Sequence, residues 1–328
     1  MLLFIDNFGS YLYKKDDLFL IKASEGKKSI SPQRVSSIII SNAATISTDA
    51  IQLATENNID IVFLNKFGEP YARVWAPTFG STATIRRRQL CSLNSIDSLR
   101  FVQYWISRKI DNQIGFIREL AIKRPLAKDY SVRLNKMEDD KARVLALEKS
   151  LDEVSFTIMA LEGNASKHYL SILSDIIPKK YRFKGRSSRP AKDYFNAFLN
   201  YGYGVLYSKV EIALIIAGLD PYTGFLHSDN YNKKSLVFDF IEPYRILIDK
   251  PTFYLFSRQR ISSKHIKQVK DGYLLNKEGK ELLLKAIFEN FDRKIRYGRR
   301  NIKQINQIKW DAHSFANYLI GKKEDFIC

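Results

Sequence analysis

Four residues between positions 162 and 242 carry side chains that can bind a metal ion or hold a proton: Glu162, His227, Asp239 and Glu242. Glu162 lies in a stretch of helical periodicity and is followed by Gly163. Because glycine inside a helix costs about 1 kcal/mol relative to alanine, its presence indicates close approach of another backbone or a ligand. A mid-helix glutamate more often faces solvent, however, so Glu162 alone does not define a site.

His227 follows a turn rich in glycine and proline, residues 218–226. A lone histidine is more often a capping or packed residue than a ligand, but two carboxylates, Asp239 and Glu242, follow shortly after it. Spaced by three, they share one face if residues 239–248 begin a helix with Pro243 in its first turn. Carboxylates and an imidazole from different helices suit Mg²⁺ or Mn²⁺, and the ligand types do not exclude Zn²⁺.

The charge of the chain is unevenly distributed. Residues 1–80 carry 8 Lys or Arg and 8 Asp or Glu, so the whole net charge of +18 lies in residues 81–328. A neutral segment joined to a strongly basic one indicates different partners, and the basic part is the candidate for binding a polyanion. Nucleic acid is the commonest such partner.

The first 80 residues have the pattern of a small β-rich domain. Short β-branched or alternating runs predict strands at residues 2–5, 18–21, 35–40, 59–64 and 72–75, with a short helix at residues 49–57. Pro77 and Gly80 end the pattern and mark a linker. The sequence therefore predicts an N-terminal sandwich-like β-domain over residues 1–80.

From residue 81 the periodicity changes to that of amphipathic helices. Helices are predicted at residues 85–121, 135–147, 150–176, 194–217, 280–295 and 312–320, with a hairpin at residues 269–275 around Asp271-Gly272. The predicted fold class is thus α+β, with the β-domain followed by a larger, all-α-helical domain over residues 81–328, the part of the chain that holds the candidate metal ligands and the basic charge.

Two runs of this second part hold clustered basic residues. Residues 179–192 contain no acid and enough Gly, Ser and Pro to predict a loop. Residues 293–309 are a second run of clustered basic residues, with Tyr297 among them. A single run would be interpreted as a solvated surface loop, but two in one basic domain favour contact with phosphates and unstacked bases. The candidate DNA-binding residues are Lys184, Arg186, Arg189, Arg245, Arg293, Arg296, Arg299 and Arg300.

Four blocks of sequence in residues 155–250 resemble the signature motifs of one family. They are residues 161–165 with Tyr169, residues 200–204 with Leu206 and Tyr207, residues 217–227, and residues 235–245. In this order the blocks are similar to those of the CRISPR-associated adaptation endonuclease and integrase family, Cas-one. The first 80 residues are similar to the family only in strand pattern and domain order.

The resemblance implies a specific function. Family members have an N-terminal β-domain that dimerises and a helical catalytic domain, and two dimers flank a dimer of the small partner Cas-two in a heterohexamer. The assembly inserts a DNA fragment into the CRISPR array by attack of a 3′-hydroxyl on a phosphodiester, and water in place of the hydroxyl makes the site a nuclease. By this resemblance Glu162, His227 and Glu242 match the metal ligands and Asp239 an acidic neighbour, while Arg245 could meet a phosphate.

Two other functions fit the composition. A nucleic-acid-binding scaffold would use the basic surface and keep the carboxylates as structural residues. A metal-dependent phosphohydrolase of small substrates is disfavoured, because a net charge of +18 exceeds what a small anion requires. No apolar run is long enough to span a bilayer and the start reads as a strand, so we expect an intracellular protein with no membrane contact. The family resemblance implies the prokaryotic cytoplasm.

Overall fold

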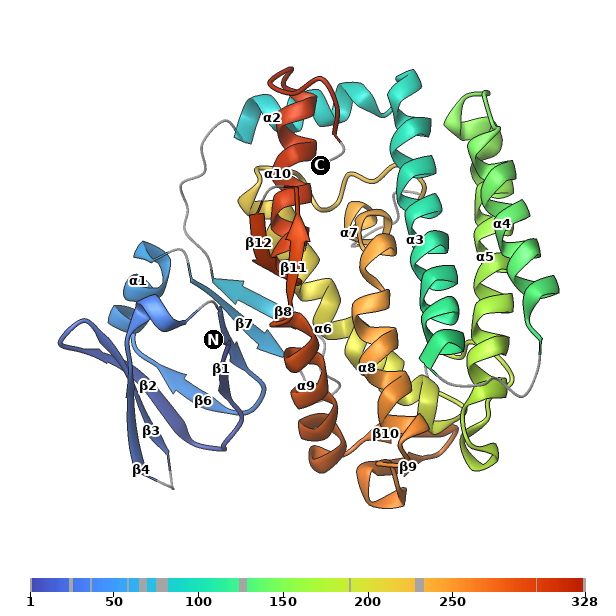
Figure 1. Ribbon diagram of the computed structural model, residues 1–328. Helices are drawn as coiled ribbons and strands as arrows, with labels where there is room; N and C mark the ends of the chain where they lie inside the picture. The colour runs from blue at the N-terminus through green and yellow to red at the C-terminus, as the bar shows by residue number, and fades with distance from the viewer. Residues whose placement is uncertain are drawn as a thin grey trace. The chain divides into compact units, whose positions relative to one another are not determined.

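The computed structural model describes residues 2–23, 26–35, 37–57, 59–64, 70–74, 82–123, 129–188, 190–227, 233–298 and 300–326. The chain divides into two compact units, residues 1–80 and 81–328 (Figure 1). The first contains strands and a short helix, and the second is mostly helical. This confirms the α+β class predicted from the sequence. The predicted linker at residues 77–80 lies outside the described residues.

The N-terminal unit contains two four-stranded sheets. The first has the order β1-β5-β7-β8, with β1, β5 and β7 parallel and β8 antiparallel to β7. The second has the order β4-β3-β2-β6, antiparallel except that β6 runs parallel to β2. The strands are β1 (Leu2–Ile5), β2 (Ser10–Lys15), β3 (Leu18–Ala23), β4 (Gly26–Ile30), β5 (Ser37–Ile40), β6 (Ala44–Ile46), β7 (Asp60–Leu64) and β8 (Pro70–Val74), with a 3-10 turn η1 (Pro32–Arg34).

Apolar side chains of both sheets and of helix α1 (Thr48–Glu56) form one core in this unit. Leu12 and Phe19 of the second sheet are fully buried with Ile38 and Ile61 of the first. Alternation along the strands directs these side chains to one face, because successive side chains of a strand point to opposite faces. Helix α1 begins where Ser47 Oγ accepts a hydrogen bond from the Ala50 amide.

The second unit is built on long helices, of which α3, α4 and α5 lie side by side (Figure 1). Helix α5 begins at a capping box between Ser150 and Glu153, and Asp193 caps α6. The helices are α2 (Thr82–Ser92), α3 (Ile96–Lys123), α4 (Ser131–Leu145), α5 (Leu151–Ile176), α6 (Tyr194–Ile216), α7 (Ser235–Phe240), α8 (Ile246–Ser257), α9 (Lys277–Phe291) and α10 (Asn306–Leu319), with 3-10 turns η2 (Lys179–Tyr181), η3 (Glu242–Tyr244) and η4 (Ser263–His265).

Most predicted helices are present, but two predictions were wrong in detail and one hairpin was not predicted. The single stretch at residues 85–121 is two helices, α2 and α3, separated by a short turn. The helix expected over residues 239–248 is broken into α7, η3 and the start of α8. Besides the expected hairpin of β9 (Ile266–Val269) and β10 (Gly272–Leu275), a second hairpin, β11 (Lys294–Tyr297) with β12 (Arg300–Lys303), occupies the second basic run.

An aromatic cluster fixes the interior of the helical unit. Phe101 and Trp105 of α3 pack edge-to-face against Phe225 and Phe315, and Trp105 also meets Phe240 at the end of α7. Such rings bury large apolar areas and hold specific geometries. The cluster therefore anchors the segment before His227 to helix α3. Within the described residues, no helix is both long and apolar enough to cross a membrane.

Candidate functional site

Glu162 and Glu242, 80 residues apart in the chain, meet at one buried ammonium group. Lys109 of α3 donates hydrogen bonds to Glu162 Oε1 of α5 and, at 2.5 Å, to Glu242 Oε2 of η3. The side chains of Lys109 and Glu242 are 8% and 6% exposed, whereas that of Glu162 is 24% exposed. The structure thus brings together two of the three predicted metal ligands around a cation.

Arg245 completes this ionic cluster. Its guanidinium binds both oxygens of Glu242, with Nε at 3.0 and 2.9 Å and a terminal nitrogen at 2.7 Å from Oε1. Burial alone would raise the pKa of Glu242, but the charges of Arg245 and Lys109 outweigh it and lower that pKa to about 2. Burial likewise lowers the pKa of Lys109, yet Glu242 and Glu162 bring it above its usual value. Glu242, Lys109 and Arg245 are therefore charged near neutral pH.

Asp239 contacts the chain segment that carries His227, not the ionic cluster around Lys109. Its carboxylate accepts the backbone amides of Phe225, Leu226 and His227 at 2.6, 3.0 and 3.2 Å, and it lies 2.5 Å from His227 Nδ1. A carboxylate oxygen accepts hydrogen bonds, so the Nδ1–H of His227 donates to Asp239 and Nε2 is the ring nitrogen left for another partner. Asp239 thereby orients the His227 ring in the manner of carboxylates that support a metal-bound histidine.

Pro243 explains why the carboxylates of Asp239 and Glu242 face different segments of the chain. It has no amide hydrogen to bond to the carbonyl of Asp239, and its ring clashes with that carbonyl in a continuous helix. Helix α7 accordingly ends at Phe240, and the chain turns into η3. Asp239 faces the 225–227 segment and Glu242 faces Lys109, whereas an unbroken helix would place both on one face.

The two glutamates fit a divalent metal ion in charge and in donor type. The Lys109 ammonium stands in for a cation between them, and carboxylate oxygens are the ligands that Mg²⁺ and Mn²⁺ prefer. His227, oriented by Asp239 and 27% exposed, offers the imidazole. In the described part of the chain, no three His, Cys, Asp or Glu side chains are yet gathered closely enough to hold a metal.

Among the described residues no other backbone approaches Gly163, so of the two expected neighbours, a backbone or a ligand, only the ligand stays a prediction. A Cβ atom built there would meet nothing within 4 Å, and Gly163 is exposed. Close approach occurs instead at Gly224, where a Cβ would lie 2.5 Å from Ser235 Cβ. That glycine lets the chain before His227 pass against the start of α7, which carries Asp239.

Gln89 is a further residue that positions His227 and that the sequence did not reveal. This fully buried amide of α2 donates to the carbonyls of Asp220 and Thr223 at 2.9 and 2.8 Å and accepts the Asp220 amide at 2.9 Å. It therefore secures the turn that leads to His227. Lys109 was missed as well, because one lysine among 53 basic residues gives no signal of its own.

Behind the ionic cluster lies a buried acid, Asp249 of α8. Tyr203 and Tyr169 donate to its two oxygens at 2.5 and 3.2 Å, and Arg245 stacks on the Tyr203 ring at 4.8 Å. Burial raises the pKa of Asp249 to about 6, although Tyr203 and Arg245 oppose the shift. The Asp249 carboxyl thus supports the aromatic face on which Arg245 rests.

The predicted DNA-binding residues fall into distinct settings. Arg245 is bonded to Glu242, and Arg186 donates to Asn196 at 3.0 Å and stacks on Tyr203. Arg189 and Arg299 lie outside the described residues. Four others have exposed side chains, namely Lys184, Arg293, Arg296 and Arg300. Arg300 of β12 lies over the ring of the exposed Trp310, 5.0 Å from its centre.

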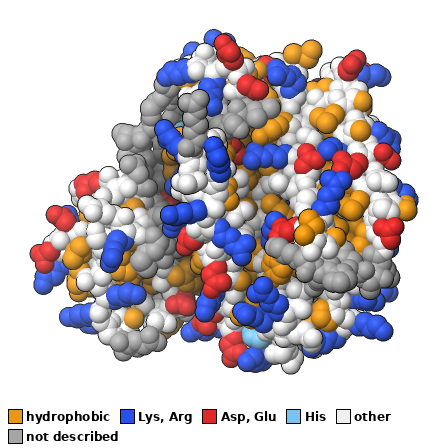
Figure 2. Space-filling model, viewed as in Figure 1, with side chains coloured by type: hydrophobic (Ala, Val, Ile, Leu, Met, Phe, Trp, Pro, Cys, Tyr) orange, Lys and Arg blue, Asp and Glu red, His pale blue; other side chains and the backbone are white. Residues whose placement is uncertain are grey.

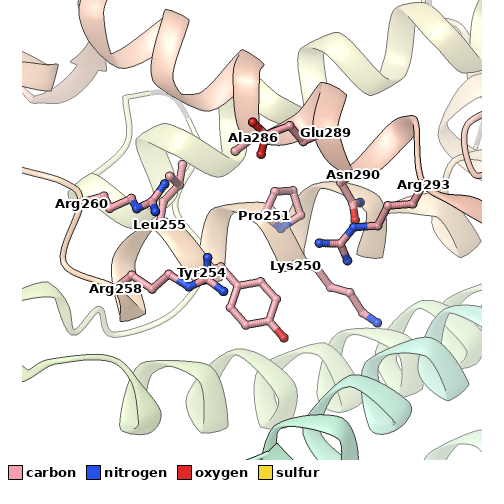
Figure 3. Close-up of a pocket in the computed structure, with 10 residues that line it drawn as sticks. All are labelled: Lys250, Pro251, Tyr254, Leu255, Arg258, Arg260, Ala286, Glu289, Asn290 and Arg293. Carbon is pink, nitrogen blue, oxygen red and sulfur yellow. The ribbon is translucent and has the colours of Figure 1, made fainter.

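Arg293 lines a hollow of about 210 Å³ between α8 and α9 (Figure 3). Lys250, Arg258 and Arg260 line it too, and Glu289 is the one acid among the lining residues. Lys250 pairs with Glu119, and Arg258 stacks on Tyr254. Figure 2 shows further Lys and Arg side chains spread over the visible face of the helical unit, with acids interspersed.

Comparison with known proteins identifies the family. Residues 3–289 match the model of the family described as CRISPR associated protein Cas1, the Cas-one family that the four motifs resemble. A relative from Archaeoglobus fulgidus, named CRISPR-associated endonuclease Cas1 1, is 32% identical over 98% of this chain and 97% of its own length. This chain belongs to the Cas1 family.

Solved structures share the fold of this Cas1 chain. A casposase bound to integration product has a TM-score of 0.85 at 22% identity, covering 99% of this chain and 92% of its own. A Cas1 protein from Thermotoga maritima has a TM-score of 0.81 at 21% identity, covering 98% of both chains. A chain of a Cas6-RT-Cas1–Cas2 complex has a TM-score of 0.77 at 19% identity, covering all of this chain and 36% of its own.

The buried acid gives a pH-dependent prediction. The pKa of Asp249 is about 6 in the folded chain and 3.8 in the unfolded chain. Ionising this carboxyl therefore lowers the free energy of unfolding as pH rises, with no loss below about pH 4 and the full loss above about pH 6. We expect this loss to reach about 3 kcal/mol. Urea unfolding of wild type and Asp249→Asn from pH 4 to 8 measures this loss. As pH rises, the free energy of unfolding of wild type should fall relative to that of the variant. A pH-independent difference would contradict the assignment.

Proposed function

We propose that this Cas1 chain is a metal-dependent DNA endonuclease and integrase of CRISPR adaptation, which inserts spacer DNA into the repeat array. The observation that carries the proposal is the convergence of Glu162 and Glu242, from α5 and η3, on one cationic position. The relatives named CRISPR-associated endonuclease and the casposase with its integration product support the same class of reaction. The nucleophile is a 3′-hydroxyl of DNA in strand transfer and water in hydrolysis.

In this proposal Glu162, Glu242 and His227 hold the metal, Mg²⁺ or Mn²⁺. When bound, the metal supplies Lewis-acid stabilisation of the phosphodiester and orientation of the attacking oxygen. Asp239 accepts hydrogen bonds from Nδ1 of His227 and from three backbone amides. The other ring nitrogen, Nε2, is then the atom that would bind the metal. Arg245 fixes the Glu242 carboxylate in one orientation through its two-oxygen contact. No protein nucleophile is required, because DNA provides the attacking group.

We further propose that the exposed cations of the helical unit hold the DNA through its phosphates. The hollow lined by Arg258, Arg260 and Arg293 presents three guanidinium groups with one neighbouring acid. The hairpin β11–β12 adds Arg296 and Arg300, the latter beside an exposed aromatic ring. Phosphate contacts of this kind position DNA without reading its sequence.

The proposed assembly follows from the same family. We propose a homodimer through the N-terminal unit and a heterohexamer with the small partner Cas-two, the Cas2 of the solved Cas6-RT-Cas1–Cas2 complex. A scaffold role without catalysis remains the competing function, and it predicts DNA binding that is indifferent to the carboxylates.

Substitution of the metal ligands separates catalysis from scaffolding. We expect Glu162→Ala and His227→Ala to lower strand transfer into a branched DNA with a repeat junction by at least about 100-fold, because even residues behind a metal ligand typically contribute 10–100-fold. DNA affinity, measured by fluorescence anisotropy, should change little. Glu148→Ala removes an exposed carboxylate close to the start of α5 and serves as the matched control. Unchanged strand transfer in both ligand variants would favour the scaffold.

Neutralising the hollow tests the DNA surface. We expect the combined change Arg258→Ala, Arg260→Ala and Arg293→Ala to weaken binding of unrelated duplexes alike and to reduce the slope of log affinity against log salt by about 2 to 3, roughly 0.9 per lost phosphate contact. Measurements of Kd between 50 and 200 mM salt give this slope. The control removes the same charge from exposed lysines of the N-terminal unit, Lys22, Lys27 and Lys28. Equal losses in the two variants would place the DNA surface elsewhere.

A further inference from the structure

Lys109 occupies the position that the proposed function assigns to a metal ion. Its ammonium donates to Glu162 and Glu242, and its side chain is only 8% exposed. Taking a charged group out of water costs several kcal/mol unless ionic partners compensate. A lysine is therefore stable here because both carboxylates face it.

The charges of the cluster balance without a metal. Glu162 and Glu242 carry one negative charge each, and Lys109 and Arg245 one positive charge each. A divalent cation added to the same two carboxylates would give the group of four side chains and the metal a net charge of two positive units, close to the Lys109 ammonium. Like charges at such distances repel strongly where water is excluded. The ammonium and the metal consequently exclude each other.

An alternative is that Lys109 only ties helices together. Asn112, one turn along α3, donates to the carbonyl of Pro243 at 2.8 Å and already joins α3 to η3 beside Glu242. Arg245 fixes the Glu242 carboxylate from its other side. Because these contacts hold η3 and Glu242 without Lys109, the lysine adds mainly a positive charge at the position between the two glutamates.

We propose that Lys109 is a resident cation that competes with the divalent metal for Glu162 and Glu242, so that metal binding is weak until a DNA phosphate arrives. The inference rests on the proposed metal-dependent function. The phosphate supplies the negative charge that offsets the metal, and the displaced ammonium gains an anionic partner. Metal and DNA therefore bind cooperatively, and the site stays in its metal-free, charge-balanced state when DNA is absent.

The test measures Mn²⁺ affinity by electron paramagnetic resonance of free Mn²⁺, with and without a short duplex whose 3′ ends are dideoxy and cannot be transferred. We expect DNA to tighten Mn²⁺ binding to the wild-type chain by about 5- to 150-fold, the usual range of coupling between sites. Lys109→Met should bind Mn²⁺ at least about 10-fold more tightly than wild type without DNA and should lose most of the DNA effect. Lys109→Gln, which keeps a hydrogen-bond donor without the charge, should behave like Lys109→Met and replaces it if the methionine variant does not fold.

Lys141 offers a matched control. It also bridges two carboxylates, Asp111 and Glu138, at 2.6 and 3.0 Å, but at a surface site of α3 and α4. Lys141→Met should leave Mn²⁺ affinity and its DNA dependence unchanged.

Each result decides between the hypotheses. Equal or weaker Mn²⁺ binding by both Lys109 variants would overturn the competition, because a lysine that merely holds the carboxylates in place would have that effect. The metal site itself is tested by Glu162→Gln, which should remove Mn²⁺ binding. If Mn²⁺ binding is the same in wild type and Glu162→Gln, even with DNA, both the proposed function and this inference fail. A DNA effect that is equal in wild type and Lys109→Met would also contradict the inference.

Discussion

The structure of the site depends on the buried ionic contact of Lys109 with Glu162 and Glu242. It joins α3, α5 and η3, three elements distant in the sequence, at a point where water is largely excluded. Each of these charges would be costly to bury without its partners, so loss of any one of them leaves the others uncompensated in the interior. The Lys109 ammonium holds the two carboxylates together against their mutual repulsion, at the position that the proposed function assigns to a metal ion.

The rest of the helical unit orients the groups around this point. The break at Pro243 turns Glu242 toward Lys109 and leaves Asp239 to bind the segment that carries His227. Gln89 and the aromatic cluster around Phe101 fix the turn before that segment. Each support acts on backbone or on a ring rather than on the reacting groups, which is how a rigid shell keeps a small site in place.

Much of this could be predicted from sequence, and the failures have physical causes. The apolar periodicity placed α5 and α6 correctly because this signal is local, and in the structure the two helices begin at caps formed by Ser150 and Asp193. The split of residues 85–121 was missed because apolar residues continue through the turn, and the hairpin β11–β12 because its alternation is hidden among cations. The motifs indicated Glu162 and Glu242, but their meeting at Lys109 depends on tertiary packing that no local pattern encodes. Asp239 was grouped with Glu242 because helical spacing was assumed across a proline that ends the helix.

A crystal structure of the chain grown with Mn²⁺ and the short duplex with dideoxy 3′ ends, with the metal located by its anomalous scattering, tests the central claim most directly. The account predicts one strong peak bonded to Glu162 and Glu242, with the His227 ring completing the protein ligands and the Lys109 ammonium moved away from both carboxylates. A peak bound elsewhere, with Lys109 still bridging the two glutamates, would contradict it.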